Sequence, residues 1–163
     1  MSSQIDVSAV LVEAEQRCKK RGERLTDKRK QILSGLLNSG TALSAYELVD
    51  YCRTEYGQAI PAMSVYRILD FLQSQDLVHK LNLANKYVAC AHITCDHAHG
   101  VPQFLICGQC QRVSEITVSK STIKALERSI DDAGFHLVSQ QLEMDCLCED
   151  CLRSNANGEL AQH

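Results

Sequence analysis

Two Cys-x-x-Cys pairs lie in the last third of the sequence, Cys107-Gly-Gln-Cys110 and Cys148-Glu-Asp-Cys151. Each pair presents two sulfurs from one tight turn, and two such turns supply the four thiolates of a tetrahedral zinc site with Zn–S distances of ~2.3 Å. The 37 residues between the pairs exceed the ~15–20 of a compact zinc finger and leave room for strands and a helix. We therefore expect a structural zinc that holds a small domain together.

Paired cysteines also occur in redox dithiols and in disulfide frameworks. A thioredoxin-like dithiol needs one Cys-x-x-Cys at the start of a helix, not two pairs. The nine cysteines are an odd number, and neither a secretory signal nor a run of ~18 apolar residues is visible. We therefore expect a cytoplasmic protein whose cysteines are thiols or metal thiolates. Cys18 and Cys52 fall on apolar helix faces and are expected to be core thiols.

Enzyme signatures that would use these residues are not evident. A zinc deaminase needs His-x-Glu upstream of Pro-Cys-x-x-Cys, and neither cysteine pair follows a proline. Neither a Ser-His-Asp arrangement nor a nucleotide-binding glycine motif is evident. We expect no enzymatic activity, and a zinc hydrolase or a dithiol oxidoreductase is the less favoured alternative.

A second group of metal-ligand types is scattered over the middle of the chain. It consists of His79, Cys90, His92, Cys95, His97, His99 and Glu115. A mixed set of sulfur, nitrogen and oxygen ligands suits Zn²⁺, whereas nitrogen and oxygen alone would suit Fe²⁺ or Mn²⁺ as well. Cys90 therefore favours zinc, although a buried thiol is the simpler interpretation of that residue alone. Cys95 with His97 is a candidate for a weaker site, and Cys146 is an alternative ligand that we do not expect to be used.

Charge is distributed unevenly along the chain. Residues 1–88 carry 12 basic and 10 acidic side chains, whereas residues 89–163 carry 5 and 10. The segment 17–30 holds eight basic residues and two acidic ones, a local charge of +6. Such a segment is typical of a surface that binds a polyanion, although a solvated helix face gives the same pattern.

The first half of the chain is predicted to form short helices followed by a β-hairpin. Apolar residues recur at helical spacing in successive stretches, and the capping box Ser44-Ala-Tyr-Glu47 opens one of them. Residues 77–83 and 86–90 have the pattern of two strands joined by a tight turn. This order predicts a winged helix-turn-helix domain over residues 1–91, a fold that places a helix in the major groove of DNA.

The second half is predicted to be a small α/β domain, which makes the whole chain α+β. A hinge over residues 92–102 precedes two strands, a helix and a last strand over 135–144. The domain, residues 103–152, has too little apolar mass to be secure alone, so a metal is expected to stabilise it. A single DNA-reading helix per chain favours a homodimer on a palindromic site. Residues 153–163 are polar and are expected to form a disordered tail.

Several segments in a fixed order carry a family resemblance. They are Arg24-Leu-Thr-Asp-Lys-Arg29, Ser44-Ala-Tyr-Glu-Leu48, Ser64-Val-Tyr-Arg-Ile-Leu-Asp-Phe-Leu72, Leu77-Val-His-Lys80 and Phe104-Leu-Ile-Cys-Gly-Gln-Cys110. Together they resemble the ferric uptake regulator (Fur) superfamily of bacterial metal-sensing repressors, most like its zinc uptake regulator (Zur) branch. The resemblance covers roughly residues 8–152. Asp27 departs from the proline that is usual in the family, but an acidic residue also suits the first turn of a helix.

The resemblance implies a regulatory zinc in addition to the structural one, which makes two Zn²⁺ ions per chain. Its ligands would be His79, Cys90, His99 (with His97 as the alternative) and Glu115. His79 and Cys90 lie on the two strands of the predicted hairpin, whereas Glu115 belongs to the second domain. A metal that binds all of them would fix the angle between the domains.

Candidate DNA contacts follow from the predicted recognition helix and from the resemblance. They are Tyr46, Ser64, Tyr66 and Arg67 near bases or backbone, and Lys28 and Arg29 at phosphates. Arginine is the usual partner of guanine O6 and N7, so Arg67 is expected to read sequence. Phosphate contacts from lysine and arginine set affinity and its salt dependence instead. A hydrophobic brace is the alternative role of Tyr66.

These observations predict a zinc-responsive transcriptional repressor. It would bind palindromic operator DNA as a zinc-loaded homodimer, with more than one dimer per operator as an option, and repress zinc-uptake genes. The first alternative is a Fur-family regulator that senses iron, manganese or peroxide. A zinc-stabilised module that does not bind DNA is a further alternative.

Overall fold

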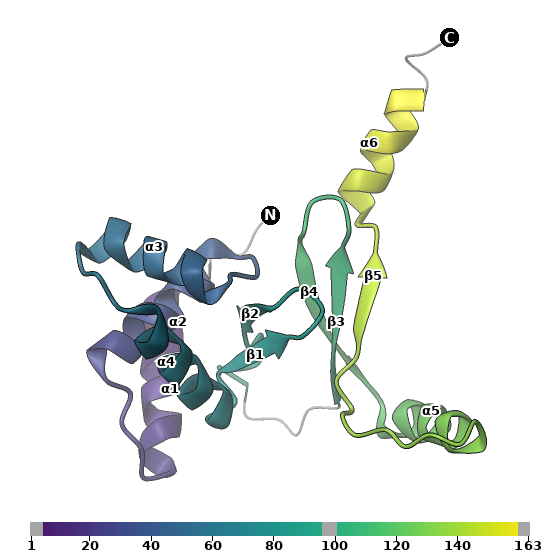
Figure 1. Cartoon of the computed structure of the whole chain (residues 1–163), viewed down its shortest axis with the longest axis horizontal. Coiled ribbons are helices and arrows are strands. Elements are labelled where there is room, and N and C mark those ends of the chain that lie inside the picture. Colours follow the sequence, from purple (N-terminus) through teal and green to yellow (C-terminus); the bar gives the residue numbers. More distant parts are fainter. Residues whose placement is uncertain (1–4, 96–100, 160–163) are drawn as a thin grey trace. The chain divides into compact units, whose positions relative to one another are not determined.

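The computed structural model describes residues 5–95 and 101–159. The chain divides into two compact units, residues 1–96 and 97–163. Each unit contains both helices and strands (Figure 1), which confirms the α+β class.

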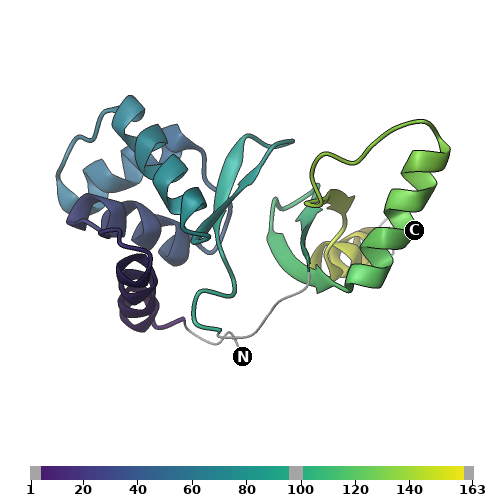
Figure 2. The ribbon, with the colours of Figure 1, turned by 90° about the horizontal axis from the view of Figure 1, so that it is seen from below.

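Within residues 5–95, the first unit consists of four helices followed by a two-stranded antiparallel hairpin (Figure 2). The elements are α1 (Val7–Lys20), α2 (Asp27–Ser39), α3 (Ala45–Tyr56), α4 (Ala62–Ser74), β1 (Val78–Leu81) and β2 (Lys86–Ala89). This order matches the winged helix-turn-helix arrangement expected from the sequence.

Local chemistry sets the ends of the helices. At the start of α3 the Ser44 hydroxyl accepts the Glu47 N–H at 3.2 Å, and the Glu47 carboxylate accepts the Ser44 N–H at 2.6 Å. This is the expected capping box, which pairs two N–H groups that the helix itself leaves without partners. Helices α2 and α3 end at Gly40 and Gly57, whose φ values of 61° and 62° lie in the left-handed region that glycine favours.

The core of the first unit lies where α2, α3 and α4 meet. Leu33, Leu48 and Leu69 contribute one fully buried side chain from each helix. Helices α2 and α3 approach closely at Gly35, where a Cβ would lie 2.9 Å from Cδ1 of Tyr51. The absence of a side chain at position 35 therefore permits this helix crossing.

The hairpin, or wing, is attached to the helices through Tyr87. This residue is 2% exposed, and its N–H and C=O both bond to Leu43, in the connection between α2 and α3, at 2.8 and 3.0 Å. The wing is thus a fixed part of the helical unit. Its register pairs Val78 with Ala89 and His79 with Val88.

The second unit is built on a three-stranded sheet in the order β4-β3-β5 (Figure 1). Its elements are β3 (Val101–Cys107), β4 (Val113–Val118), α5 (Lys120–Asp132), β5 (Glu143–Cys146) and α6 (Glu149–Glu159). Strand β3 pairs antiparallel with β4 and parallel with β5. Among its described residues, the buried apolar side chains apart from Cys107 are Phe104, Ile106 and Ile123, which is a small core for a unit of this length.

The last strand is shorter than the expected 135–144 and begins only at Glu143. The reason is Gln103, whose side chain is 1% exposed. Its amide oxygen accepts the Leu142 N–H at 2.6 Å, and its amide nitrogen donates to the Gln140 carbonyl at 2.8 Å. A side chain therefore takes the place of ladder hydrogen bonds, and the segment before β5 follows β3 without becoming a strand.

Two further expectations differ from the structure. The predicted hinge, 92–102, overlaps β3, which tolerates Pro102 because pairing with β5 begins only at Phe104. The predicted disordered tail, 153–163, overlaps α6 as far as residue 159. Acidic residues in the first turn and a 3.2 Å pair between Glu149 and Arg153 favour this helix despite its polar sequence.

Candidate metal centres and DNA-binding surface

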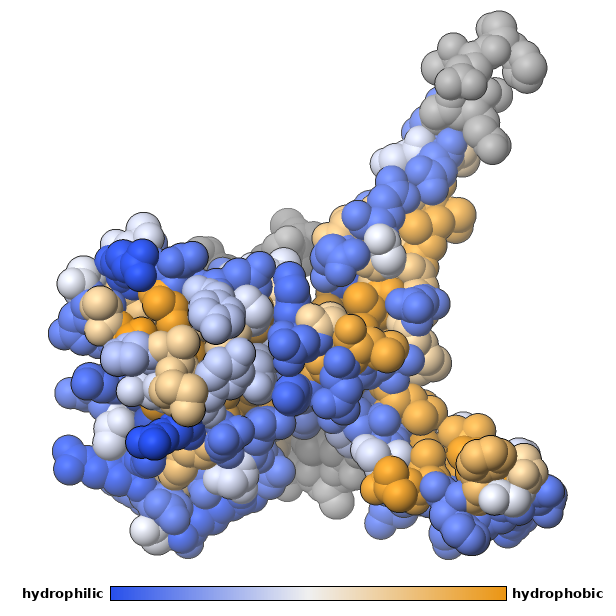
Figure 3. All heavy atoms as spheres, in the orientation of Figure 1, coloured by the Kyte–Doolittle hydropathy of each residue, from blue (hydrophilic) through white to orange (hydrophobic). Residues whose placement is uncertain are grey.

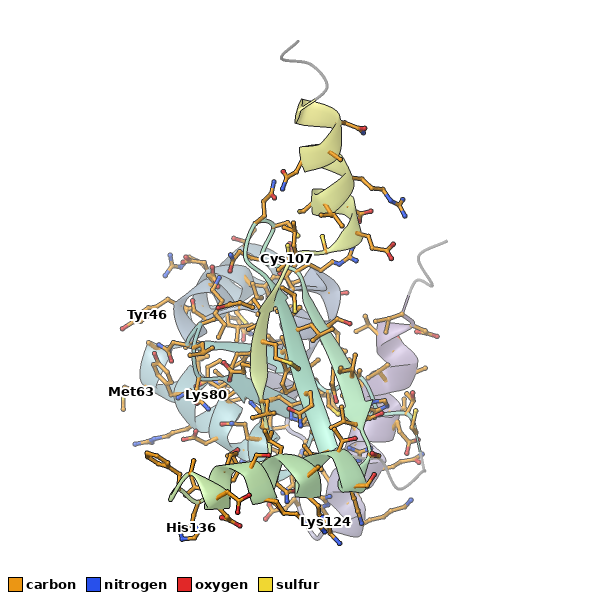
Figure 4. The ribbon with its side chains drawn as sticks, turned by 90° about the vertical axis from the view of Figure 1, so that its right-hand side faces the viewer. Tyr46, Met63, Lys80, Cys107, Lys124 and His136 are labelled. Carbon is orange, nitrogen blue, oxygen red and sulfur yellow. The ribbon has the colours of Figure 1, made fainter. Side chains whose placement is uncertain are left out.

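The four cysteines of the two Cys-x-x-Cys pairs come together at one end of the second unit's sheet. Cys107 ends β3, Cys110 lies in the following turn, Cys148 follows β5, and Cys151 lies in the first turn of α6. Cys107 is seen where the sheet meets α6 (Figure 4). The four sulfur atoms all lie within 4.8 Å of one another, and the sulfurs of Cys110 and Cys148 are 3.7 Å apart. A regular tetrahedron with Zn–S distances of ~2.3 Å has S–S edges of ~3.8 Å, so the four sulfurs form a cluster that could hold a zinc ion.

Backbone hydrogen bonds hold this arrangement. The Gly108 N–H donates to the Cys146 carbonyl at 3.0 Å, and the Cys148 N–H points to the Cys107 sulfur at 3.4 Å. The turn is closed by the Cys107 N–H, which donates to the Arg112 carbonyl at 2.9 Å. The parallel pairing of β3 with β5 therefore brings together two motifs that are far apart in sequence. Among the described residues the cluster contains four cysteines, and Cys146 is outside it.

The chemistry of the cluster favours a cation. Backbone N–H groups, that of Cys110 first and then those of Cys148 and Gln109, lower the pKa of Cys107 to about 6. The neighbouring thiols, Cys148 first, raise the pKa of Cys151 to about 12. One sulfur is therefore prepared as a thiolate, and the full set of thiolates requires a bound metal ion. Four sulfur ligands leave no open position for substrate, so this centre is suited to structure and not to catalysis.

The structure also brings together two members of the second ligand group. His79 on β1 and Cys90 just after β2 are both half-buried, and a ring nitrogen of His79 lies within 4.8 Å of the Cys90 sulfur. The Cys90 N–H donates to the Leu77 carbonyl at 2.9 Å, and the His92 N–H points to the Cys90 sulfur at 3.4 Å. Wing geometry thus presents a sulfur and an imidazole nitrogen together. Glu115 lies on β4 of the second unit, half-buried.

The structure describes only some of the remaining histidines and cysteines that the sequence singled out. His97 and His99 lie outside the described residues. Cys95 is half-buried in the turn after the wing. Cys18 and Cys52 are fully buried core thiols, as expected, and burial raises the pKa of each.

Helix α4 presents a continuous exposed stripe on one face. The stripe consists of Met63, Arg67, Asp70 and Ser74, at spacings of four, three and four residues. Val65, Leu69 and Leu72 occupy the buried face. Arg67 is therefore exposed as expected, and Ser64 lies beside the stripe, half-buried. Tyr66 packs partly against the core, which favours the brace over the base contact.

Two exposed side chains lie in the first turns of α3 and α4. Tyr46, at the start of α3, and Met63, at the start of α4, are each 67% exposed. Both project outward on the same side of the first unit (Figure 4). Met63 was not among the predicted contacts. Its position four residues before Arg67 could have identified it, because residues at that spacing share a helix face.

Part of the basic segment has internal roles that the sequence does not reveal. The Arg29 guanidinium lies 3.5 Å from the centre of the Phe71 ring and donates to the Arg24 carbonyl at 2.6 Å. Arg17 donates to backbone carbonyls, and Arg21 pairs with Asp76. The guanidinium groups of Arg17, Arg21 and Arg29 therefore have partners within the first unit, and the phosphate contact of Arg29 stays a prediction. Lys28 is exposed, and its phosphate contact likewise stays a prediction.

A winged helix-turn-helix unit followed by a small unit with a four-cysteine centre is the architecture of a metal-dependent transcription regulator. The chain belongs to the ferric uptake regulator family, whose model matches residues 20–145. Members of this family are transcription regulators, so the chain is not classed as an enzyme. No helix in the described part of the chain is long and apolar enough to cross a membrane.

Several relatives share most of the chain. The zinc uptake regulation protein of Escherichia coli is 35% identical over 156 residues, which cover 94% of this chain and 89% of the relative. The ferric uptake regulation protein of Synechococcus elongatus is 30% identical over 136 residues, which cover 82% and 89%. Among solved structures, a zinc uptake regulator complexed with zinc and DNA has a TM-score of 0.79 at 31% identity, covering 93% of this chain and 98% of its own. The crystal structure of holo XcZur has a TM-score of 0.73 at 36% identity, covering 90% and 99%.

Proposed function

We propose that the chain is a zinc-responsive transcriptional repressor that binds palindromic operator DNA as a zinc-loaded homodimer and represses zinc-uptake genes. The observation that carries this proposal is the pair of His79 and Cys90 on the wing of a DNA-binding fold. A thiolate beside an imidazole is selective for zinc over iron or manganese, which are well served by nitrogen and oxygen ligands. The similarity to a zinc uptake regulation protein supports the same metal.

The regulatory site would be completed by Glu115 and by His99, with His97 as the alternative. This set offers sulfur, nitrogen and oxygen ligands, which fit four-coordinate zinc. The structural site would use Cys107, Cys110, Cys148 and Cys151, so two zinc ions per chain are expected. When bound, zinc supplies a centre that joins ligands of both units.

The coupling to DNA follows from differential affinity. His79, Cys90 and Glu115 would hold zinc best in an arrangement in which the two units bring their ligands together, and a dimer in that arrangement would present its two α4 helices at the operator spacing. A coupling of ~1–3 kcal/mol would change operator affinity roughly 5–150-fold. The same coupling requires that operator DNA tighten zinc binding by an equal factor.

Base contacts are assigned to the exposed start of α4 and to its neighbour α3. Arg67 is suited to guanine O6 and N7, and Met63 offers an apolar surface for a thymine methyl. Tyr46 would contact the backbone or a base, and Lys28 a phosphate. Ser64 would contact the backbone from beside the stripe.

Dimerisation is assigned to the second unit. Apolar residues gather over its sheet and α5 (Figure 3), where Ile116 and Met144 are each 36% exposed. Exposed apolar surface of this kind marks a protein–protein contact, and the second unit of another copy would cover it in a dimer. One α4 helix per chain then gives two half-sites per operator, and further dimers could bind a longer one. A regulator of this kind would act in the cytoplasm, where its DNA is.

The test is operator selection followed by metal titration. A pool of random DNA duplexes is selected with the zinc-saturated protein, and the affinity for the selected duplex is measured at buffered free Zn²⁺, Fe²⁺ and Mn²⁺. We expect an inverted repeat and an affinity that rises with zinc alone. A response to iron or manganese and not to zinc would favour the alternative that similarity to ferric uptake regulation proteins supports.

A further inference from the structure

Arg17 makes the most extensive side-chain contacts of the basic segment. It lies on α1 and is half-buried. Its Nη2 donates to the carbonyls of Ile93 at 2.7 Å and His92 at 3.4 Å, and its Nη1 donates to the carbonyl of Asp76 at 3.2 Å. One guanidinium thus joins segments that are 59 and 76 residues away in sequence.

These segments are the two ends of the wing. Asp76 lies in the turn between α4 and β1, three residues before His79. His92 and Ile93 lie two and three residues after Cys90, beyond the end of β2, and Ile93 is 3% exposed. Because α1 holds the entry and the exit of the wing with one side chain, the strands that carry His79 and Cys90 cannot separate there without breaking its hydrogen bonds.

His92, which accepts a hydrogen bond from Arg17, also contacts Cys90. The His92 N–H points to the Cys90 sulfur at 3.4 Å, and the Cys90 N–H donates to the Leu77 carbonyl at 2.9 Å. Arg17 therefore holds the His92–Ile93 peptide, which directly follows the Ala91–His92 peptide whose N–H faces the sulfur. Hydrogen bonds from a charged donor in a partly buried place are stronger than neutral ones, so this anchor is stable.

We propose that Arg17 is a positioning residue of the regulatory zinc site, which keeps His79 and Cys90 together as a preformed half-site. This inference rests on the proposed function. The same guanidinium binds the turn that ends α4, so it also ties the half-site to the helix that would read DNA. Groups outside the ligand shell that orient ligands typically contribute 10–100-fold to metal affinity.

Arg21 provides a matched control. It lies one turn later, at the C-cap of α1, and its guanidinium contacts Asp76 Oδ2 at 2.9 Å and the Ser74 carbonyl at 3.4 Å. These side-chain contacts are with the end of α4 and the turn after it, on the entry side of the wing and not with His92 or Ile93. Arg17→Met and Arg21→Met each remove one positive charge from the same helix, so any general loss of DNA attraction is common to both.

The experiment measures two quantities on the full-length protein. The first is zinc affinity of the regulatory site, by competition with a chromophoric chelator. The second is hydrogen exchange of the peptide containing Cys90, in protein that carries zinc only at the four-cysteine site. We expect Arg17→Met to lower regulatory zinc affinity by about 10–100-fold and to speed exchange, with Arg21→Met close to wild type and Arg17→Lys between the two.

Equal zinc affinity and equal exchange in Arg17→Met and Arg21→Met would overturn the proposal. If Arg17→Met does not fold, the same two measurements are made on Arg17→Lys and Arg21→Lys. The larger loss of regulatory zinc affinity is again expected for Arg17→Lys, and equal losses would overturn the proposal. A wild-type protein without a second zinc would refute the proposed function, and the exchange measurement would still decide whether Arg17 holds the wing.

Discussion

Replacing Arg29 or its neighbour Lys28 separates two roles of basic residues in the segment 17–30. Both changes remove one positive charge at adjacent positions on α2. Arg29 stacks over Phe71 of α4 and donates to the Arg24 carbonyl, whereas Lys28 is exposed. We therefore expect Arg29→Ala to lower the stability of the fold and Lys28→Ala to weaken DNA binding.

The size of the Arg29 effect follows from its two contacts. A cation over an aromatic ring contributes ~0.5–2 kcal/mol, with the lower part of the range at exposed sites. A hydrogen bond from a charged donor contributes ~1.5–3 kcal/mol when buried, and less here because this bond is exposed. We expect a net loss of about 1–2 kcal/mol, and each kcal/mol lowers Tm by roughly 4–8 °C in a domain of this size.

Thermal unfolding of the zinc-saturated protein measures the first effect, and DNA binding over a range of salt measures the second. Lys28→Ala should leave Tm unchanged within error and reduce the slope of log affinity against log salt by ~1. Arg29→Ala should lower Tm by about 4–16 °C. An Arg29→Ala protein as stable as Lys28→Ala would refute the assignment of Arg29 to the fold.

Three further predictions concern specificity, the zinc centre and the helix crossing. Arg67→Ala should lower the discrimination against other bases at one guanine of the selected operator by about 1–3 kcal/mol of binding free energy. Met63→Ala should lower the preference for a neighbouring thymine. Both effects are measured as the difference in affinity between the selected duplex and its single-base variants. Cys110→Ser should lose one zinc and the folded second unit, whereas Cys146→Ser should keep both zincs, as measured by metal counting. Zinc binding to the four-cysteine site should also release one more proton below pH 6 than above it. The reason is that Cys107, with a pKa of about 6, is protonated only below that pH. Gly35→Ala should destabilise the first unit by about 1–3 kcal/mol in urea, since its Cβ would lie 2.9 Å from a tyrosine ring on α3, and a gain in stability would contradict the tight crossing.

Local signals predicted much of the fold and tertiary contacts decided the rest. The capping box at Ser44 depends on residues three apart, and the Cys-x-x-Cys pairs are a known arrangement of metal ligands. The sequence alone was therefore enough to predict the start of α3 and the cluster of four cysteines. Arg17 and Arg29 looked like free charge because their partners are backbone carbonyls and a ring in distant segments. Gln103 carried no signal at all, since a buried amide that replaces strand pairing has no sequence pattern. The ligand role of His79 likewise depended on a family resemblance, because a lone histidine on a strand has many uses.

In the proposed function, zinc at Cys90 controls DNA binding while zinc at the four cysteines maintains the fold. The most direct measurement is metal counting on wild type and Cys90→Ser, combined with affinity for the selected operator at controlled free zinc. We predict two zincs per chain in wild type and one in Cys90→Ser, with an unchanged fold by circular dichroism and loss of zinc-dependent operator binding. A Cys90→Ser protein that binds one zinc and still binds its operator as tightly as zinc-loaded wild type would show that zinc at Cys90 does not control DNA binding.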